Sequence, residues 1–398
     1  MSDHINPGDQ YPAEAPNRLD NLRYADGVVL WDDVKKAAGE EGNTTQASNT
    51  RVLKFFAESS NKAWKELWLP NGLEIKLRQR ITFNRKVGLL GAEAALGTNK
   101  PHIYVDKEPE GQDKPYRLVF PHGARVESVN FSAESGLAPG GIMAFGFWGT
   151  DNDPNVDSSI KYCAFNVGAD NIAIHYNGRN CRVENCAFSD GVRCTALKLQ
   201  YYNIYKGEEA GWRKNFFQYN QVHLGTSCTA VVVNGASVDT QQCALQDFRI
   251  CNNKFDIGCR ILYQVNCVNA NYQINHNEWT GADNNWNSKQ DGSGVIEFRD
   301  LNVSGTINNN TFNSQDVSDN KRPNHFIRWT NRLDTSNVTV YGNSFMYNAD
   351  GKYAVKFEGE KNGMGAGSNV AANDNGSKCG NGAFNWGPNV ANNSGSKF

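Results

Sequence analysis

A phrase that recurs along the chain constrains the fold more than any other feature of the sequence. In "QINHNEWTG" (273–281), an apolar residue leads through Asn and one further residue to an aromatic residue, which we use as an anchor. Related phrases give eight anchors, at intervals of 34, 23, 34, 33, 24, 33 and 33 residues: Phe131, Phe165, Phe188, Val222, Phe255, Trp279, Phe312 and Phe345. Such self-similarity at a short period is typical of repeat architectures.

The positions just before each anchor predict a bend. The fifth residue before the anchor is apolar in every repeat: Val126, Ile160, Val183, Phe217, Ile250, Ile274, Ile307 and Val340. In one flat strand, residues five apart point to opposite faces, so the chain must turn between the two apolar positions. The second residue before the anchor is Asn in the last five repeats. Asn tolerates the left-handed conformation of a sharp corner, so we expect the corner at this Asn.

A third short strand follows each anchor, as in "LKL" (197–199) and "IEF" (296–298). Units of this length with three short strands predict an all-β fold, a right-handed parallel β-helix whose coils stack. Stacking places the asparagines in a ladder, where each amide is satisfied on a neighbouring coil. We therefore interpret the phrase as a stacked corner and not as an active site. The outward residues Glu297, Arg328 and Lys356 are expected to form a solvated charge ladder.

An antiparallel β-sandwich or propeller is the alternative interpretation. It requires hairpin turns between most strands, with Asn-Gly or Asp-Gly as the strongest signals. Such dipeptides occur at 177–178, 190–191 and 234–235, too few to pair every strand. The β-helix is favoured.

Composition excludes several functions. The 398 residues carry a formal net charge of −2, which gives no electrostatic reason to expect nucleic acid or an anionic membrane. No apolar run is long enough for a membrane span, and the polar start is not that of a secretory signal peptide. The ten cysteines form no CxxC pair, so we expect buried free thiols in a protein folded in cytosol. No metal or cofactor motif is present.

Four regions are expected along the chain. Residues 1–30 are an extended arm, and residues 31–120 are an N-terminal cap with an amphipathic helix over 51–67, whose apolar positions include Val52, Phe55, Phe56 and Trp64. Residues 121–360 are the coils, and residues 361–398 are an irregular Gly/Asn-rich segment. The helix is placed to cover the open end of the β-helix, which otherwise invites edge-to-edge aggregation.

The cap resembles that of phage tailspikes and related polysaccharide depolymerases with the pectate-lyase-like β-helix. The matching segments are "GNTTQASNT" (42–50), the helix from Arg51, "LPNG" (69–72) and "VGLLGAE" (87–93). Asn49 and Thr50 stand where this family usually has paired Asp residues. The resemblance implies a homotrimer in the virion, attached to other tail proteins by the N-terminal arm, made in the host cytoplasm and acting outside the cell on a bacterial surface polysaccharide.

Long loops that leave a regular solenoid are the expected places for a site. Aromatic rings stack on sugars and carboxylates bind hydroxyls, and three segments combine the two: 145–157, 200–215 and 280–294. The predicted substrate-binding residues are Trp148, Asp151, Asp153, Tyr201, Tyr202, Trp212, Arg213 and Trp286.

Glycoside hydrolysis needs two carboxyl groups across the scissile bond. Glu208 or Glu209 is expected to pair with Asp157 or Asp239 on a neighbouring coil. The leading hypothesis is a tailspike-like protein that binds and hydrolyses a polysaccharide. The alternatives are a non-enzymatic virion adhesin or structural spike on the same scaffold, and a polysaccharide lyase in which Arg213, Lys206 and Tyr205 serve as the base or neutralise a uronate.

Overall fold

The structure is a computed structural model, and statements about it concern the residues that it describes. These are 27–91, 99–106, 116–137, 140–147, 156–177, 180–201, 215–225, 227–235, 247–256, 260–265, 271–281, 294–298, 304–318, 322–330, 337–347, 354–358, 369–373, 376–378, 384–385 and 391–392. Within them lie two helices, α2 (Trp31–Ala37) and α3 (Gln46–Glu58), and three sheets of parallel strands. None of the described helices has the length and apolar character needed to cross a membrane.

From β2 onward, every third strand joins the same sheet. Sheet A has thirteen described strands: β1 (Val28–Leu30), β2 (Glu66–Leu69), β5 (Gly88–Gly91), β8 (Arg125–Glu127), β11 (Ser158–Lys161), β14 (Cys181–Glu184), β17 (Asn215–Gln218), β20 (Phe248–Cys251), β23 (Asn271–Asn275), β26 (Ser304–Asn308), β29 (Asn337–Tyr341), β32 (Asn369–Asn373) and β35 (Ala391–Asn392). Sheet B has eleven: β3 (Glu74–Leu77), β6 (His102–Val105), β9 (Asn130–Ala133), β12 (Ala164–Asn166), β15 (Ala187–Ser189), β18 (Gln221–His223), β21 (Lys254–Asp256), β24 (Glu278–Thr280), β27 (Thr311–Asn313), β30 (Ser344–Met346) and β33 (Gly376–Lys378).

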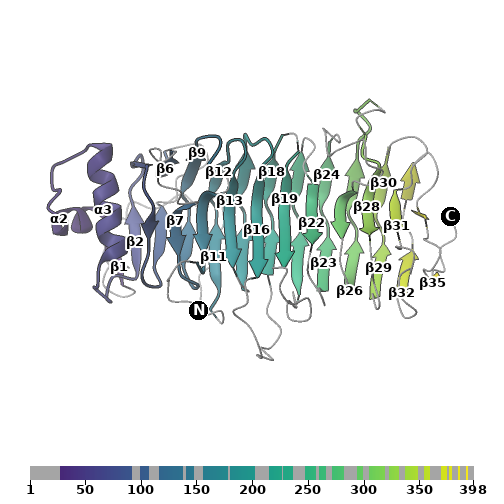
Figure 1. The fold of residues 1–398 in the computed structure, drawn as a ribbon, viewed down its shortest axis with the longest axis horizontal. Coiled ribbons are helices and arrows are strands. Elements are labelled where there is room, and N and C mark those ends of the chain that lie inside the picture. The colour runs from purple at the N-terminus through teal and green to yellow at the C-terminus, as the bar shows by residue number, and fades with distance from the viewer. Residues whose placement is uncertain are drawn as a thin grey trace, which may run out of the picture.

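Sheet C also has eleven described strands: β4 (Ile81–Thr82), β7 (Tyr116–Phe120), β10 (Gly141–Phe145), β13 (Ile172–Asn177), β16 (Thr195–Tyr201), β19 (Thr229–Gly235), β22 (Arg260–Val265), β25 (Gly294–Phe298), β28 (His325–Thr330), β31 (Val355–Glu358) and β34 (Phe384–Asn385). Successive coils thus stack along one axis, with α2 and α3 at one end and β35 at the other (Figure 1). The parallel pairing confirms the predicted fold class and rules out the antiparallel alternative.

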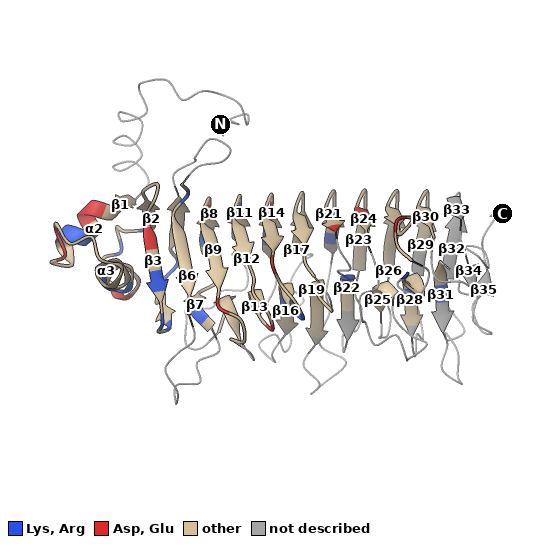
Figure 2. Cartoon of the chain, turned by 90° about the horizontal axis from the view of Figure 1, so that it is seen from above, with Lys and Arg blue, Asp and Glu red and all other residues tan. Residues whose placement is uncertain are grey.

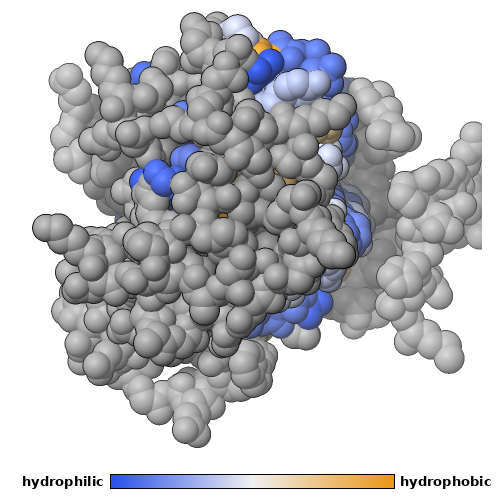
Figure 3. Space-filling model, turned by 90° about the vertical axis from the view of Figure 1, so that its right-hand side faces the viewer, coloured by the Kyte–Doolittle hydropathy of each residue, from blue (hydrophilic) through white to orange (hydrophobic). Residues whose placement is uncertain are grey.

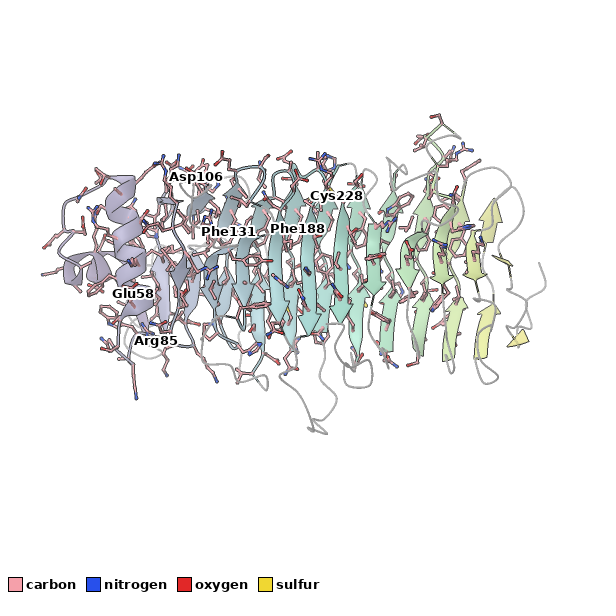
Figure 4. All side chains as sticks on the ribbon, in the orientation of Figure 1. Glu58, Arg85, Asp106, Phe131, Phe188 and Cys228 are labelled. Carbon is pink, nitrogen blue, oxygen red and sulfur yellow. The ribbon has the colours of Figure 1, made fainter. Side chains whose placement is uncertain are left out.

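The predicted columns are present in the register. The eight anchors pair in sequence from Phe131 to Phe345 in sheet B, and the eight apolar residues from Val126 to Val340 pair in sheet A. The rings of Phe131 and Phe165 stack at 5.1 Å, and those of Phe165 and Phe188 at 4.9 Å. Phe131 and Phe188 lie in one row along the axis (Figure 4). The coils therefore share a continuous core.

The corner differs from the prediction by one residue. The left-handed conformation belongs to the third residue before the anchor, with φ between 53° and 64°, in Ser128, Tyr162, Asn185, Tyr219, Asn252, His276, Asn309 and Gly342. The expectation that the Asn two before the anchor takes this conformation is wrong. That Asn is buried, and it serves the ladder instead.

The buried asparagines form the predicted amide ladder. The Asn277 Nδ2 group donates to the carbonyl of Ile250 at 2.7 Å and to Asn310 Oδ1 at 2.9 Å. The Asn277 backbone N–H donates to the same Oδ1 at 3.0 Å, and Asn253 makes the equivalent bonds to Asn277. Each amide thereby satisfies backbone groups that the corner removes from the sheet ladders.

Cysteine takes the ladder position in two earlier coils. Cys163 and Cys186 are buried, and the Cys186 backbone N–H donates to Asn220 Oδ1 at 2.9 Å. The Cys186 thiol donates to the carbonyl of Ile160 at 3.6 Å, and burial raises its pKa well above the ordinary value. Six cysteines are described, and all six are buried and free, which confirms the prediction for that part of the chain.

The capping helix is confirmed, but with other boundaries. α3 covers Gln46–Glu58 and starts at Thr45, whose hydroxyl accepts the Ser48 N–H, so it begins and ends earlier than the predicted span 51–67. The side chains of Asn49 and Thr50 donate to the carbonyls of Glu74 and Lys76, each at 2.8 Å. β3 is the first strand of sheet B, so the helix satisfies carbonyls on an open sheet edge.

Candidate functional site

Three of the segments that carry predicted site residues connect a sheet C strand to the next sheet A strand. They are 148–155 between β10 and β11, 202–214 between β16 and β17, and 236–246 between β19 and β20. β10, β13, β16 and β19 follow one another in sheet C, as β11, β14, β17 and β20 do in sheet A, so the strands that flank the three segments border the same corner of the coils. The segment 282–293 connects β24 of sheet B to β25 of sheet C and leaves at a different corner.

Most of the predicted site residues lie outside the described part of the chain. These are Trp148, Asp151, Asp153, Tyr202, Glu208, Glu209, Trp212, Arg213, Asp239 and Trp286, and with them the alternative bases Tyr205 and Lys206. Tyr201 ends β16, and only its backbone is described. Asp157 is described, immediately before β11, with its side chain 56% exposed.

Beside Asp157, the outward residues of four neighbouring strands form a continuous polar and aromatic surface. We call it the sheet A face, and it consists of Asp157, Ser159 and Lys161 at β11, Arg182 and Glu184 on β14, Phe216 and Gln218 on β17, and Asp247 and Arg249 at β20. β11, β14, β17 and β20 are consecutive in sheet A. Three of these strands, β11, β17 and β20, are the ones that follow the three long segments in the sequence.

An aromatic ring between two guanidinium groups lies at the centre of the sheet A face. Register places Arg182, Phe216 and Arg249 side by side on β14, β17 and β20. The Cζ atom of Arg182 is 4.2 Å from the ring centroid of Phe216, and that of Arg249 is 5.6 Å from it. Cation–π contact holds the two charged groups over an otherwise apolar ring. The ring is 8% exposed as a result.

Carboxylates surround these cations. Asp157 Oδ2 lies 3.4 Å from Arg182 Nε, and Asp247 Oδ1 lies 3.5 Å from Arg249 Nε. Glu184 is more enclosed: its oxygens contact Lys161 Nζ at 2.9 Å, Arg182 Nη1 at 3.8 Å and Gln218 Nε2 at 2.6 Å. Three formal positive charges and three formal negative charges therefore balance on the surface.

This surface suits a neutral ligand that both donates and accepts hydrogen bonds. Guanidinium, ammonium and amide groups donate, carboxylates accept, and a hydroxyl does both. A flat sheet with rows of such groups matches a long polyhydroxylated chain better than a compact molecule. Among the described residues, no group of His, Cys, Asp and Glu side chains is arranged to hold a metal ion.

Arg182, Glu184 and Phe216 are not among the site residues predicted from the sequence, because those predictions concern long loops and these three residues lie on strands. The repeat itself contains the signal. Residues six and four before each anchor flank the inward apolar residue, so they must point outward. Before anchor Phe188 these are Arg182 and Glu184, and before anchor Val222 they are Phe216 and Gln218. Across four consecutive repeats, these two positions contain most residues of the sheet A face: Ser159, Lys161, Arg182, Glu184, Phe216, Gln218 and Arg249.

The outward residues of sheet C correct another prediction. Glu297, Arg328 and Lys356 do stack on successive coils, but Glu297 is fully buried and Arg328 is 9% exposed. Glu297 lies between two guanidinium groups, 3.2 Å from Arg260 Nη1 and 3.5 Å from Arg328 Nη1. A solvated charge ladder is therefore the wrong description, because a buried carboxylate requires such partners.

A second buried polar cluster lies on sheet C around His175. Its Nε2 is 2.9 Å from Gln200 Oε1, its Nδ1 is 2.5 Å from the Tyr116 hydroxyl, and its ring lies 4.6 Å from that of Phe147. Desolvation by burial, followed by the nearby charge of Lys198, lowers the pKa of His175 to about 3. The imidazole is thus neutral at physiological pH, which suits a packing role and not that of a proton donor.

Charged residues gather on the helical cap and are sparse along the described strands of the coils (Figure 2). Viewed along the axis from the other end, the visible described surface is mostly hydrophilic (Figure 3). Like charges on stacked coils would be directly opposite each other, which is unfavourable. On the sheet A face, Lys161 lies beside Glu184, and Phe216 separates Arg182 from Arg249, so no like charges are directly opposite each other.

Comparisons with known proteins find similarity in structure alone. No protein-family model matches the sequence, and no curated protein matches it. The A-module of mannuronan C-5 epimerase AlgE4 from Azotobacter vinelandii aligns at 12% identity over 86% of this chain and 95% of that one, with a TM-score of 0.38. The surface protein and adhesin PfbA from Streptococcus pneumoniae aligns at 10% identity, 92% and 99% coverage, and a TM-score of 0.37.

The Dettilon tailspike protein also aligns, at 13% identity over 91% of this chain and 71% of that chain, with a TM-score of 0.33. At such identities the likeness concerns the fold alone, and the parallel sheets establish that fold by themselves. The resemblance stated from the cap and the repeats is confirmed at this level: the chain is a right-handed parallel β-helix protein with a helical N-terminal cap.

Proposed function

We propose that the protein binds a bacterial surface polysaccharide along its coils and hydrolyses it. The ligand lies on the sheet A face, because this surface presents hydrogen-bond donors and acceptors in rows on neighbouring strands. The single observation that carries the proposal is the stack of Arg182, Phe216 and Arg249, with Asp157 and Glu184 against it.

For hydrolysis, Asp157 supplies one carboxylate. Its side chain is 56% exposed, whereas that of Glu184 is 9% exposed and contacts Lys161, Arg182 and Gln218. The second carboxylate of this proposal is Glu208, Glu209 or Asp239. The strands before and after the segments that carry these residues are β16 and β17 for Glu208 and Glu209, and β19 and β20 for Asp239, and this order along the chain supports their choice.

The experiment separates binding from cleavage. Purified protein is incubated with dextran, pullulan, polygalacturonate and hyaluronan, and with capsular polysaccharides of several bacteria, while binding, reducing ends and ultraviolet absorbance are measured. New reducing ends without a rise in ultraviolet absorbance support hydrolysis. A rise in absorbance from a new double bond contradicts hydrolysis and supports the lyase alternative. Binding without new reducing ends and without a rise in absorbance contradicts cleavage and supports the non-enzymatic adhesin.

Variants then assign the roles. Asp157→Asn abolishes the production of reducing ends and keeps binding, whereas Arg182→Gln weakens binding at least tenfold. Arg193→Gln is the matched control, because Arg193 is an exposed arginine in an ion pair with Asp170 away from the sheet A face. Wild-type affinity in Arg182→Gln would contradict the assignment of the surface.

The resemblance to tailspikes adds three proposals about the setting. They are a homotrimer, attachment to tail proteins through residues 1–30, and a place in the virion. Light scattering tests the first directly, since the chain mass is 44.1 kDa and a trimer has three times that mass. A monomer at all concentrations would remove the assembly from the proposal and leave the binding surface unaffected.

A further inference from the structure

At the corner between sheets A and B, two tyrosines occupy backbone positions that tyrosine seldom takes. Tyr162 and Tyr219 are corner residues with φ of 56° and 58°. Gly and Asn enter this left-handed region readily, whereas a bulky side chain there is an outlier with a conformational cost. Other coils place Asn185, Asn252 and Asn309 at the same corner, so an unstrained choice was open to the sequence.

Neither tyrosine recovers this cost by burial. Tyr162 is 47% exposed and Tyr219 is 54% exposed, among the most exposed large hydrophobic residues that the structure describes. Strain that the core does not require is commonly associated with a ligand site. Packing in the core therefore does not explain the backbone conformation of these two tyrosines, whereas contact with a ligand does.

The left-handed corner residues of successive coils form a column along the axis, and this column fixes the spacing of the two tyrosines. The Tyr162 N–H donates to the carbonyl of Glu184, the Asn185 N–H to that of Gln218, and the Tyr219 N–H to that of Cys251, so these corners lie on consecutive coils. Neighbouring parallel strands are about 4.8 Å apart, so Tyr162 and Tyr219 stand about 9.6 Å apart along the axis. This distance spans about two sugar units of an extended chain, with Asn185 between the rings.

The strip beside the tyrosines is polar. Lys161, Glu184 and Gln218 directly precede the three corner residues, and Glu184 binds the other two at 2.9 Å and 2.6 Å. On the other side, Lys100 Nζ donates to the carbonyl of Tyr162 at 2.8 Å. A ligand here meets aromatic faces and hydrogen-bonding groups together, which fits the apolar face and the hydroxyl edge of a pyranose ring.

We propose that Tyr162 and Tyr219 are stacking platforms for a linear glycan that runs parallel to the axis of the β-helix. Alternate sugars lie on the two rings, and the sugar between them contacts Asn185. This inference rests on the proposed carbohydrate function and deepens it. It assigns an unbranched, extended chain as the ligand, and it extends the sheet A face to the corner with sheet B.

The test uses substitutions that favour the fold. Tyr162→Asn and Tyr219→Asn install the residue that other coils have at this corner, so the melting temperature stays the same or rises. Each substitution weakens binding of the polysaccharide found for the wild type by about tenfold, and the double variant by about a hundredfold. Tyr162→Phe and Tyr219→Phe keep the ring and retain most of the affinity.

Tyr104→Asn is the control, because Tyr104 is 36% exposed on β6, away from this corner, and it leaves affinity unchanged. If the double Asn variant binds with full affinity while Arg182→Gln binds more weakly, the two tyrosines are not stacking platforms, and the proposed function remains supported. If no polysaccharide of the panel binds the wild type, both fail. A changed oligomeric mass in the double variant also overturns the platforms, since the tyrosines then belong to an interface between copies of the chain.

Discussion

Two adjacent residues with different tasks form the corner between sheets A and B in the last five repeats. The first takes the left-handed conformation and is exposed, whereas the second is a buried Asn that supplies the ladder, as His276 and Asn277 show. Asn suits both tasks, so a sequence rich in Asn cannot by itself say which position does which. Hydrogen bonds from the second Asn to the coils on both sides decide it.

Asn277→Ala is expected to destabilise the protein by about 2–4 kcal/mol. It leaves the carbonyl of Ile250 and the N–H of Asn253 buried without these partners, and each such group costs about 1–3 kcal/mol. Urea unfolding gives the difference. Glu278→Ala, at the exposed neighbouring residue, is the control and stays within about 0.5 kcal/mol. Equal stability of the two variants would mean that the ladder does not support the fold.

His175 gives the protein a pH dependence. The folded-state pKa of about 3 lies below the unfolded value of 6.5, so the unfolded chain binds the extra proton between these values. Stability therefore falls as pH decreases from 6.5, by about 1.4 kcal/mol per pH unit. His175→Gln removes this contribution, so between pH 7 and pH 5 the wild type loses about 2 kcal/mol more than the variant. Parallel curves for the two proteins would contradict the neutral, buried imidazole.

At the scale of the element, the cap helix shows how far an apolar pattern reaches. Val52 and Phe56 face the core as predicted, but Trp64 reaches the same cluster from a turn after the helix, and its ring stacks on that of Phe56 at 6.4 Å. The apolar residues have the same spacing in the sequence whether the helix continues to Trp64 or ends earlier and the chain turns back toward the core. The spacing alone therefore does not give the end of the helix. The boundary depended on Thr45 as N-cap and on Ser59, which leaves the helical conformation.

Phe56→Ala is expected to cost about 3–5 kcal/mol, because Phe56 is fully buried between the helix and the first coils. Loss of the cap also exposes the first sheet edges, so soluble aggregates are expected on size-exclusion chromatography. The neighbour Phe55 is 39% exposed, and Phe55→Ala is the matched control with little effect. Similar behaviour of the two variants would contradict the capping role of this helix face.

At the scale of the whole molecule, one hydrophobic cluster runs from Val29 in β1 to Val355 in β31. Each coil contacts only its neighbours, so stability is shared along the axis through this continuous core. The same stacking explains the sheet A face. It aligns outward residues into rows, so Arg182, Phe216 and Arg249 meet although they are 34 and 33 residues apart in sequence.

The described coils are expected to unfold in a single transition. Leu67→Ala in β2 and Val340→Ala in β29 remove buried side chains near opposite ends of the cluster, and both lower the midpoint of that one transition. Differential scanning calorimetry is the measurement. A second endotherm, moved by one variant and not by the other, would show that the solenoid is divided into independent units.

The sequence by itself determined the solenoid, its period, the two apolar columns and the stacked amides. These follow from local rules: side-chain parity, the turn chemistry of Asn, and the need of each coil to match the next. Only the tertiary structure decided which residues share a surface. Outward side chains are not constrained by the core, so their pattern is free, and the contacts of Arg182 with Phe216 and the enclosure of Glu297 arise from stacking and coverage that no single repeat contains.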